Sequence, residues 1–327
     1  MTAKLTKQEK DSIAKLLLDK VYGKFPEKAE HLNIDTKHES INYAAGHAIY
    51  REQTMEPEIK GKIHTIHFTS VIPTKSHPCP AIISLNQEQN VPNKFLPAEE
   101  IIDRGYAIFS LCVTDTENAD VKTNYNAYKK LVKSRNRSNA PGKITISAYF
   151  ASLLCDYIMT LKEIDKSAII ISGHAEFAKA ALLACGLDDR ISFAISNDSL
   201  SLIANAGLNP DIGSRFAYDF PNLFCHAFLQ DPIQDEHMLL LRLCESKNLL
   251  IGCSADDIAS NYETEYEALM SALRCDRVKS PFEKGKIPTT PLLFEGNSFS
   301  YHLRSGTSYF SREDWNIYLD FIDKKLI

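Results

Sequence analysis

The chain has 327 residues, of which 44% are hydrophobic and 24% charged, and its formal net charge is −5. This composition is that of an ordinary globular protein with a sizeable core, and the acidic balance argues against binding a polyanion such as nucleic acid. No apolar run approaches the roughly 20 residues that span a bilayer. The first residues, Met1 to Gly23, are lysine-rich and lack the apolar segment of a secretory signal. We therefore predict a cytoplasmic protein that binds neither nucleic acid nor membrane.

Eight cysteines are scattered along the chain, several of them inside apolar segments, and no C-x-x-C motif occurs. This usage is typical of buried thiols in a reducing compartment rather than of disulfides or a structural zinc site. His47, His64 and His67 crowd one region, where surface histidines on a pleated strand are a better interpretation than metal ligands. We expect no metal and no cofactor.

The first part of the chain mixes helical and strand patterns. Residues 1–24 are predicted to form an amphipathic helix that packs on the body of the fold, because Leu5, Ile13 and Leu16 recur at helical spacing. The polar, poorly periodic residues 114–142 are predicted to form a surface excursion over a cleft. Strands are predicted at 44–53 and 63–72 (an antiparallel pair), 80–85 and 106–111, and helices at 97–104, closed by Gly105, and 145–161.

A strand, a sharp turn and a helix are predicted around residues 168–195. Ala168–Ile171 reads as a buried strand, Gly173 as the turn, and a small-residue helix follows that Gly186 ends. This order is the frame of a nucleophile elbow, in which a G-x-S-x-G turn presents a serine at the edge of the sheet. The serine position is Ala175, whose side chain has no nucleophile.

The remaining chain continues the alternation of strands and helices. Residues 200–231 are irregular and are predicted to form a second surface excursion. The alternation predicts an α/β fold with a mainly parallel central sheet and helices on both faces, in a single domain of residues 1–327. Strands are predicted at 191–196, 248–253 and 290–294, helices at 235–243, 262–273 and 312–326, and a loop at 297–311.

Several stretches resemble the glucuronoyl esterases and their acetyl-xylan-esterase-like relatives, which are α/β-hydrolases acting on plant cell-wall esters. The elbow of that family reads Gly-His/Cys-Ser-Arg-x-Gly-Lys, and residues 173–179 read Gly-His-Ala-Glu-Phe-Ala-Lys. The resemblance covers about residues 20–327 and implies an α/β-hydrolase fold. Its other matching stretches follow in the right order, at 97–106, 181–191, 235–240 and 313–321.

The resemblance implies that the catalytic serine and histidine are replaced. The serine position is Ala175, the base position is Ser308, and the arginine that helps to hold the oxyanion in the family is Glu176. A carboxylate there would repel the negative charge of an ester-cleaving transition state. The acid position is Asp198 or, in the alternative placement, the pair 256–257 (Asp256 and Asp257), and an acid that orients no histidine has no catalytic task.

The resemblance also implies three ligand contacts. Lys179 matches the lysine that contacts the sugar in family members, and His174 and His302 match histidine positions of the family. The family tryptophan expected near residues 258–259 is missing, because Trp315 is the only tryptophan in the chain.

Each surviving residue also has a plainer interpretation. Lys179 reads as a solvated or snorkelling lysine, and Glu176 as an exposed first-turn residue of a helix. Asp198 reads as a turn or helix cap, for which Asp198→Asn should cost about 1 kcal/mol or less. Cys253 and Ser254 have no identifiable base, so a core thiol and a loop hydroxyl are better interpretations than replacement nucleophiles.

Three functional hypotheses follow. We favour a catalytically degenerate hydrolase that retains a cleft and binds a small carbohydrate or ester-like ligand. The alternatives are an esterase that uses rearranged cleft residues, and a scaffold kept for protein–protein contact, such as pairing with an active homologue. The sequence leaves the ligand, the partner and the oligomeric state open.

Overall fold

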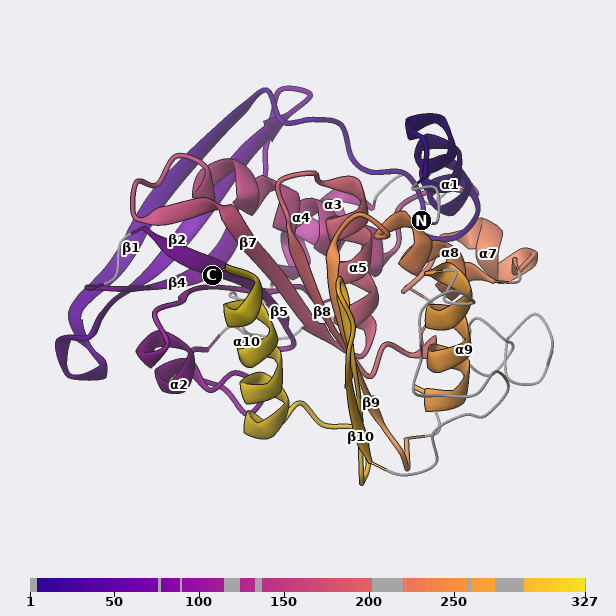
Figure 1. Ribbon diagram of the computed structural model, residues 1–327. Helices are drawn as coiled ribbons and strands as arrows, with labels where there is room; N and C mark the ends of the chain where they lie inside the picture. The colour runs from indigo at the N-terminus through magenta and orange to yellow at the C-terminus, as the bar shows by residue number, and fades with distance from the viewer. Residues whose placement is uncertain are drawn as a thin grey trace.

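A twisted sheet runs through the computed structural model (Figure 1). The part of the chain that the structure describes comprises residues 5–75, 78–88, 90–114, 124–132, 137–201, 220, 222–233, 235–257, 260–273 and 291–326. Within it the sheet has eleven strands in the order β1-β2-β4-β6-β5-β7-β8-β9-β11-β10, and β3 pairs with β2. The strands are β1 (His31–Tyr43), β2 (Ala48–Ile59), β3 (Lys62–Ile63), β4 (Ile66–Pro73), β5 (Cys79–Asn86), β6 (Ala107–Cys112), β7 (Ile164–His174), β8 (Phe193–Asn197), β9 (Asn248–Ser254), β10 (Leu292–Glu295) and β11 (Phe299–Arg304).

The centre of the sheet is parallel and its flanks are antiparallel. Strands β6, β5, β7, β8, β9 and β11 are parallel neighbours, whereas β1, β2 and β4 pair antiparallel on one side and β10 on the other. Because parallel strands need crossover connections, helices cover the sheet. They are α1 (Lys7–Lys20), α2 (Ala98–Asp103), α3 (Tyr125–Leu131), α4 (Lys143–Ile158), α5 (Glu176–Leu187), α7 (His226–Gln230), α8 (Glu236–Leu243), α9 (Tyr262–Ala272) and α10 (Arg312–Leu326).

Two hydrophobic cores lie on the two faces of this sheet. Alternate residues of a strand enter opposite cores: Ile83 of β5 belongs to the core under α4, α5 and α8, and Ile82 to the core under α2 and α10. This alternation is the period-2 geometry of a strand buried on both faces. The predicted mainly parallel sheet with helices on both faces is confirmed.

The N-terminal amphipathic helix is also confirmed. Helix α1 begins after a Thr6–Glu9 capping box and contacts α7 and α8, with Leu17 fully buried. Among the described residues, no helix has both the length and the apolar character needed to cross a membrane.

Several boundaries and two strands differ from the prediction. The long strand β1 was not predicted, because most of its side chains are exposed and give no alternating pattern. Strand β11 lies inside the predicted loop 297–311. Gly186 lies within α5 rather than ending it, and it is needed there because a Cβ would lie 2.7 Å from Leu243 Cγ.

The described parts of the two predicted excursions, residues 114–142 and 200–231, contain the short helices α3 and α7. Residues 115–123, 133–136, 202–219 and 221 of these excursions lie outside the described residues. The surface interpretation is wrong for His64, whose side chain is buried and whose pKa burial lowers. All seven cysteines in the described residues are buried, as predicted.

Candidate functional site

The predicted elbow forms a sharp turn between β7 and α5. Strand β7 ends at His174, α5 begins at Glu176, and Ala175 between them has φ 56° and ψ −122°. A residue with a Cβ is strained in this region of backbone space, and such strain persists only where the surroundings enforce it. The turn therefore keeps the backbone that presents a nucleophile, although the side chain it presents is a methyl group.

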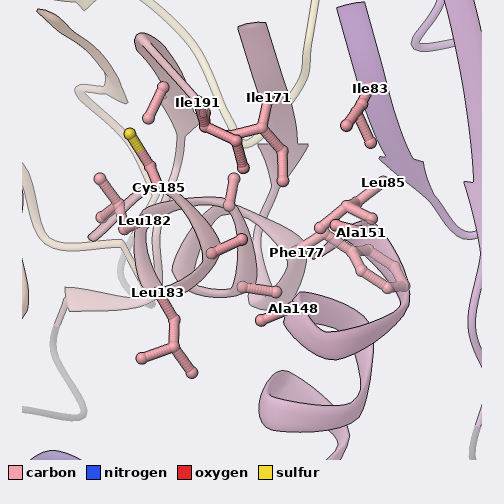
Figure 2. Close-up of a cluster of buried hydrophobic side chains, with 14 of the residues drawn as sticks. Ile83, Leu85, Ala148, Ala151, Ile171, Phe177, Leu182, Leu183, Cys185 and Ile191 are labelled. Atoms are coloured by element: carbon pink, nitrogen blue, oxygen red, sulfur yellow. The ribbon is translucent and has the colours of Figure 1, made fainter. Parts of the chain in front are cut away.

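Close packing under the turn enforces this conformation. A Cβ at Gly173 would lie 2.1 Å from the carbonyl oxygen of Phe177, so only glycine allows the first turn of α5 to approach the end of β7. Figure 2 shows the buried side chains that hold α5 against the sheet and α4. They include Ile83 and Leu85 of β5, Ala148 and Ala151 of α4, Ile171 of β7, and Phe177, Leu182, Leu183 and Cys185 of α5.

Hydrogen bonds fix the tautomer of His174, the residue before Ala175. The Asn197 amide is oriented by its neighbours, because its Nδ2 donates to the carbonyl of Tyr309 (2.7 Å) and its Oδ1 accepts from the Tyr318 hydroxyl (3.0 Å). Asn197 Nδ2 also lies 3.1 Å from His174 Nδ1, which must then accept. The imidazole proton is therefore on Nε2, which donates to Ser308 Oγ (3.3 Å).

Burial keeps this imidazole neutral. Burial and, as the second cause, the nearby Arg304 charge lower the pKa of His174 to about 4. Ser308 Oγ accepts from His174 and lies 3.3 Å from Asp198 Oδ2, to which it donates. The structure thus brings Ala175, His174, Asp198 and Ser308 together, but in an arrangement where the imidazole gives a proton to the serine rather than taking one.

Asp198 is a buried, heavily hydrogen-bonded carboxylate. Its Oδ1 accepts from the backbone N–H of Ser254 (2.8 Å), and its Oδ2 accepts from Arg304 Nη2 (2.8 Å) and the backbone N–H of Tyr309 (3.2 Å). It is 0% exposed and binds groups that are remote in the chain, so it does more than cap a local turn or helix. Burial raises the pKa of Asp198 to about 6, while Arg304 and Ser254 oppose the rise.

Glu176 does not extend into solvent as the plainer interpretation expects. Its side chain is only 13% exposed, and Lys143 Nζ donates to Glu176 Oε1 (3.3 Å). Lys143 also lies over the Phe177 ring at 5.2 Å. A cation is therefore present beside the elbow, and it is paired with the Glu176 carboxylate.

The predicted ligand contacts occupy different environments. Lys179 is 0% exposed and pairs with Glu236 (2.9 Å), so the interpretation as a solvated or snorkelling lysine is wrong. His302, on β11, is 7% exposed and lies 3.1 Å from Asp314, whose pKa it lowers. Of the three, only His174 touches the group formed by Ala175, Asp198 and Ser308.

The alternative nucleophiles Cys253 and Ser254 end β9, and the alternative acids Asp256 and Asp257 follow it. Asp257 influences the pKa of both His174 and Asp198 through its charge, whereas Asp256 is exposed. Cys253 is fully buried and burial raises its pKa, as expected of a core thiol. The Ser254 hydroxyl is not a loop hydroxyl but a buried donor to Asp198. Residues 258–259, where the family tryptophan was expected, lie outside the described residues.

Two features beside His174 and Asp198 were not predicted from the sequence. They are the aromatic pair Phe95 and Tyr309, and the partly buried Arg304. The Phe95 ring lies 4.9 Å from the His174 ring and 5.4 Å from the Tyr309 ring, which is 44% exposed. Arg304 was placed in a loop, although it ends β11 and bridges Asp198 to Asp314. Arg304 directly follows Tyr301-His302-Leu303 in the sequence, and this position could have indicated that it belongs to the site. In the described part of the chain, no group of three or more His, Cys, Asp or Glu residues could hold a metal ion.

Comparisons with known proteins support the fold. The glucuronoyl esterase from Solibacter usitatus superposes with a TM-score of 0.74 at 18% identity, covering 97% of this chain and 92% of that one. A carbohydrate esterase family 15 glucuronoyl esterase from Caldicellulosiruptor kristjansonii gives 0.73 at 21% identity, covering 99% and 87%. The chain has an α/β-hydrolase fold. The fold of these esterases agrees with the resemblance found in the sequence.

One curated relative matches by sequence. Carbohydrate esterase MZ0003, from an unknown prokaryotic organism, is 28% identical over 192 residues, which cover 55% of this chain. The match covers 44% of the length of that relative. No family model matches the chain.

Proposed function

We propose that this protein is a catalytically degenerate carbohydrate-esterase-like α/β-hydrolase, which binds a sugar- or ester-like ligand in the remaining cleft without hydrolysing it. The observation that carries the proposal is Ala175, which occupies the strained elbow position and has no nucleophilic atom. Loss of the serine and histidine of such a triad removes on the order of 10⁶-fold in turnover.

The surroundings of Ala175 support the same proposal. Stabilising an oxyanion needs free donors aimed at the developing charge. Here the side-chain cation beside the turn, Lys143, is paired with Glu176. The carboxylate of Glu176 and its pairing with Lys143 disfavour a build-up of negative charge above Ala175.

A specific observation favours a second candidate, an esterase in which Ser308 is the nucleophile. Ser308 is exposed and lies within 3.3 Å of both His174 Nε2 and Asp198 Oδ2. A general base must accept the proton of the nucleophile. The Asn197 amide instead holds His174 as a donor to Ser308, so we rank this candidate second.

A binding and turnover assay separates the candidates. We expect saturable binding of methyl glucuronate by calorimetry, with no hydrolysis of this ester or of 4-nitrophenyl acetate above background. Ser308→Phe should block binding, because it places a ring beside His174, whereas the matched change Thr307→Phe on the same exposed loop should not. Hydrolysis that Ser308→Ala abolishes would establish the second candidate. Absence of both binding and hydrolysis would contradict the proposal and favour the scaffold hypothesis.

A further inference from the structure

A second group of buried charged side chains lies behind the elbow, where α5, α8 and α9 meet. Lys179 of α5, Glu236 and His237 of α8, and Glu265 of α9 are each 0% exposed. Lys179 Nζ lies 2.9 Å from Glu236 Oε2 and 3.1 Å from His237 Nδ1. His237 Nε2 lies 2.7 Å from Glu265 Oε1. The four residues form one continuous hydrogen-bonded cluster.

Hydroxyl groups cap both ends of this cluster. The Tyr22 hydroxyl, just beyond α1, donates to Glu236 Oε1, and the Ser199 hydroxyl donates to Glu265 Oε2. Ser199 directly follows Asp198, so the cluster is joined through the chain to the group of residues beside Ala175. The cluster also faces Cys253 of β9 and Tyr301 of β11, both neutral at neutral pH because burial raises the pKa of each.

The charges of the cluster do not balance unless it binds a proton. Two carboxylates, one ammonium and a neutral imidazole leave one net negative charge, and an unbalanced charge away from water is costly. His237 does not take the proton while Lys179 is charged, because its Nδ1 would then turn an N–H toward the ammonium. Glu265 accepts from both His237 and Ser199, which favours its ionised form and lowers its pKa.

Glu236 also accepts from two donors, Tyr22 and Lys179, so the choice between the two carboxyl groups follows from burial and from the repulsion by ionised Glu265. Burial is the main cause that raises the pKa of Glu236 to about 8, and the charge of Glu265 adds to the rise. Burial also lowers the pKa of Lys179 to about 7. A protonated Glu236 can donate to the Tyr22 hydroxyl oxygen beside it while its other oxygen accepts from Lys179.

We propose that the cluster holds one labile proton on Glu236 at neutral pH, and that loss of this proton in mildly alkaline solution loosens the junction of α5, α8 and α9 behind the elbow. This proton-sensitive device is independent of any ligand in the cleft. At neutral pH we therefore expect Glu236 to be a neutral carboxylic acid, while the exposed carboxylates of the chain are charged.

Infrared spectroscopy of the wild-type protein tests the proposal directly. At pH 7 we expect the carbonyl stretch of a protonated carboxylic acid, and we expect it to disappear by pH 9. The band should be absent from Glu236→Gln, which replaces the protonated group by an amide of the same shape. It should remain in Glu263→Gln, a matched acid-to-amide change at an exposed position of α9. No such band in the wild type at pH 7, or a band unchanged in Glu236→Gln, would overturn the proposal.

The pH dependence of stability gives a second readout. A pKa raised on folding contributes stability that is present at low pH and is lost as the pH rises toward the folded-state pKa. Between pH 5 and 8 the urea midpoint of the wild type should therefore fall relative to that of Glu236→Gln. Parallel curves for the two proteins would overturn the proposal, and Glu263→Gln should follow the wild type.

Discussion

The backbone of the elbow and the side chains around Ala175 are held by different kinds of contact. The turn is held from below by Gly173 against Phe177 and by the core around α5, none of which depends on a serine. Above the turn lie the methyl group of Ala175 and a polar network that includes His174, Asp198 and Ser308. Packing below the turn therefore holds its strained backbone independently of which side chain the turn presents.

The largest effect is expected below the turn. Gly173→Ala would place a Cβ 2.1 Å from the Phe177 carbonyl oxygen, which is backbone of the first turn of α5 and does not give way cheaply. We expect a loss of about 3 kcal/mol in the free energy of unfolding. Urea denaturation of the two proteins measures it, and a loss under about 1 kcal/mol would show that core packing does not hold the turn.

The buried acid of the cleft should respond almost as strongly. In Asp198→Asn the amide nitrogen must face either the backbone N–H of Ser254 or that of Tyr309, because each carboxylate oxygen accepts one of them. It also leaves Arg304 without this counter-charge. We expect a loss of about 2–3 kcal/mol by urea denaturation, above the 1 kcal/mol of a simple cap. A loss at or below that value would restore the cap interpretation.

His174 should show its neutral, donor state in solution. Since burial lowers its pKa to about 4, the stability linked to this residue is complete above pH 6.5 and is lost as the pH falls toward 4. NMR titration of the ring should therefore give a midpoint well below 6.5. The urea midpoint of His174→Gln should fall less than that of the wild type over this window. A ring that titrates near 6.5 would mean that His174 is solvated and available as a base.

The smallest effect is expected at Ala175 itself. Ala175→Gly relieves a backbone strain of about 1–3 kcal/mol but adds freedom to the unfolded chain worth about 0.4–1 kcal/mol. We expect a net gain of about 1 kcal/mol, measured by urea denaturation beside Gly173→Ala. A net loss would show that the turn relaxes in solution to a conformation without strain.

The sequence predicts the buried parts of the fold well, because apolar periodicity reports burial. Helix α10 was predicted with the bounds 312–326, and the elbow at 168–195 was found from its β-branched strand and glycine. Strand β1 was missed because its exposed side chains carry no such period. Strand β11 was missed because it is short and lies next to residues that read as a loop.

The sequence predicted which residues lie at the candidate site, but not which groups surround their side chains. The sequence indicated Ala175, Asp198 and Ser308 as site positions. No local pattern reveals that Arg304 pairs with Asp198, or that Glu236 pairs with Lys179. These pairs join residues that are far apart in the chain. Burial of a charged side chain depends on such partners, which only the folded structure supplies.

Labelling with a fluorophosphonate probe, followed by peptide mass spectrometry, tests the absence of a nucleophile most directly. The wild-type protein should stay unlabelled, including at Ser308, because His174 donates to that hydroxyl. The triple variant Ala175→Ser, Glu176→Arg and Ser308→His should be labelled at position 175 and gain about 10–10³-fold in ester hydrolysis over the parent, whereas any one change alone should do almost nothing. Labelling of Ser308 in the wild type would contradict the account, and the protein would then be an esterase with a relocated serine.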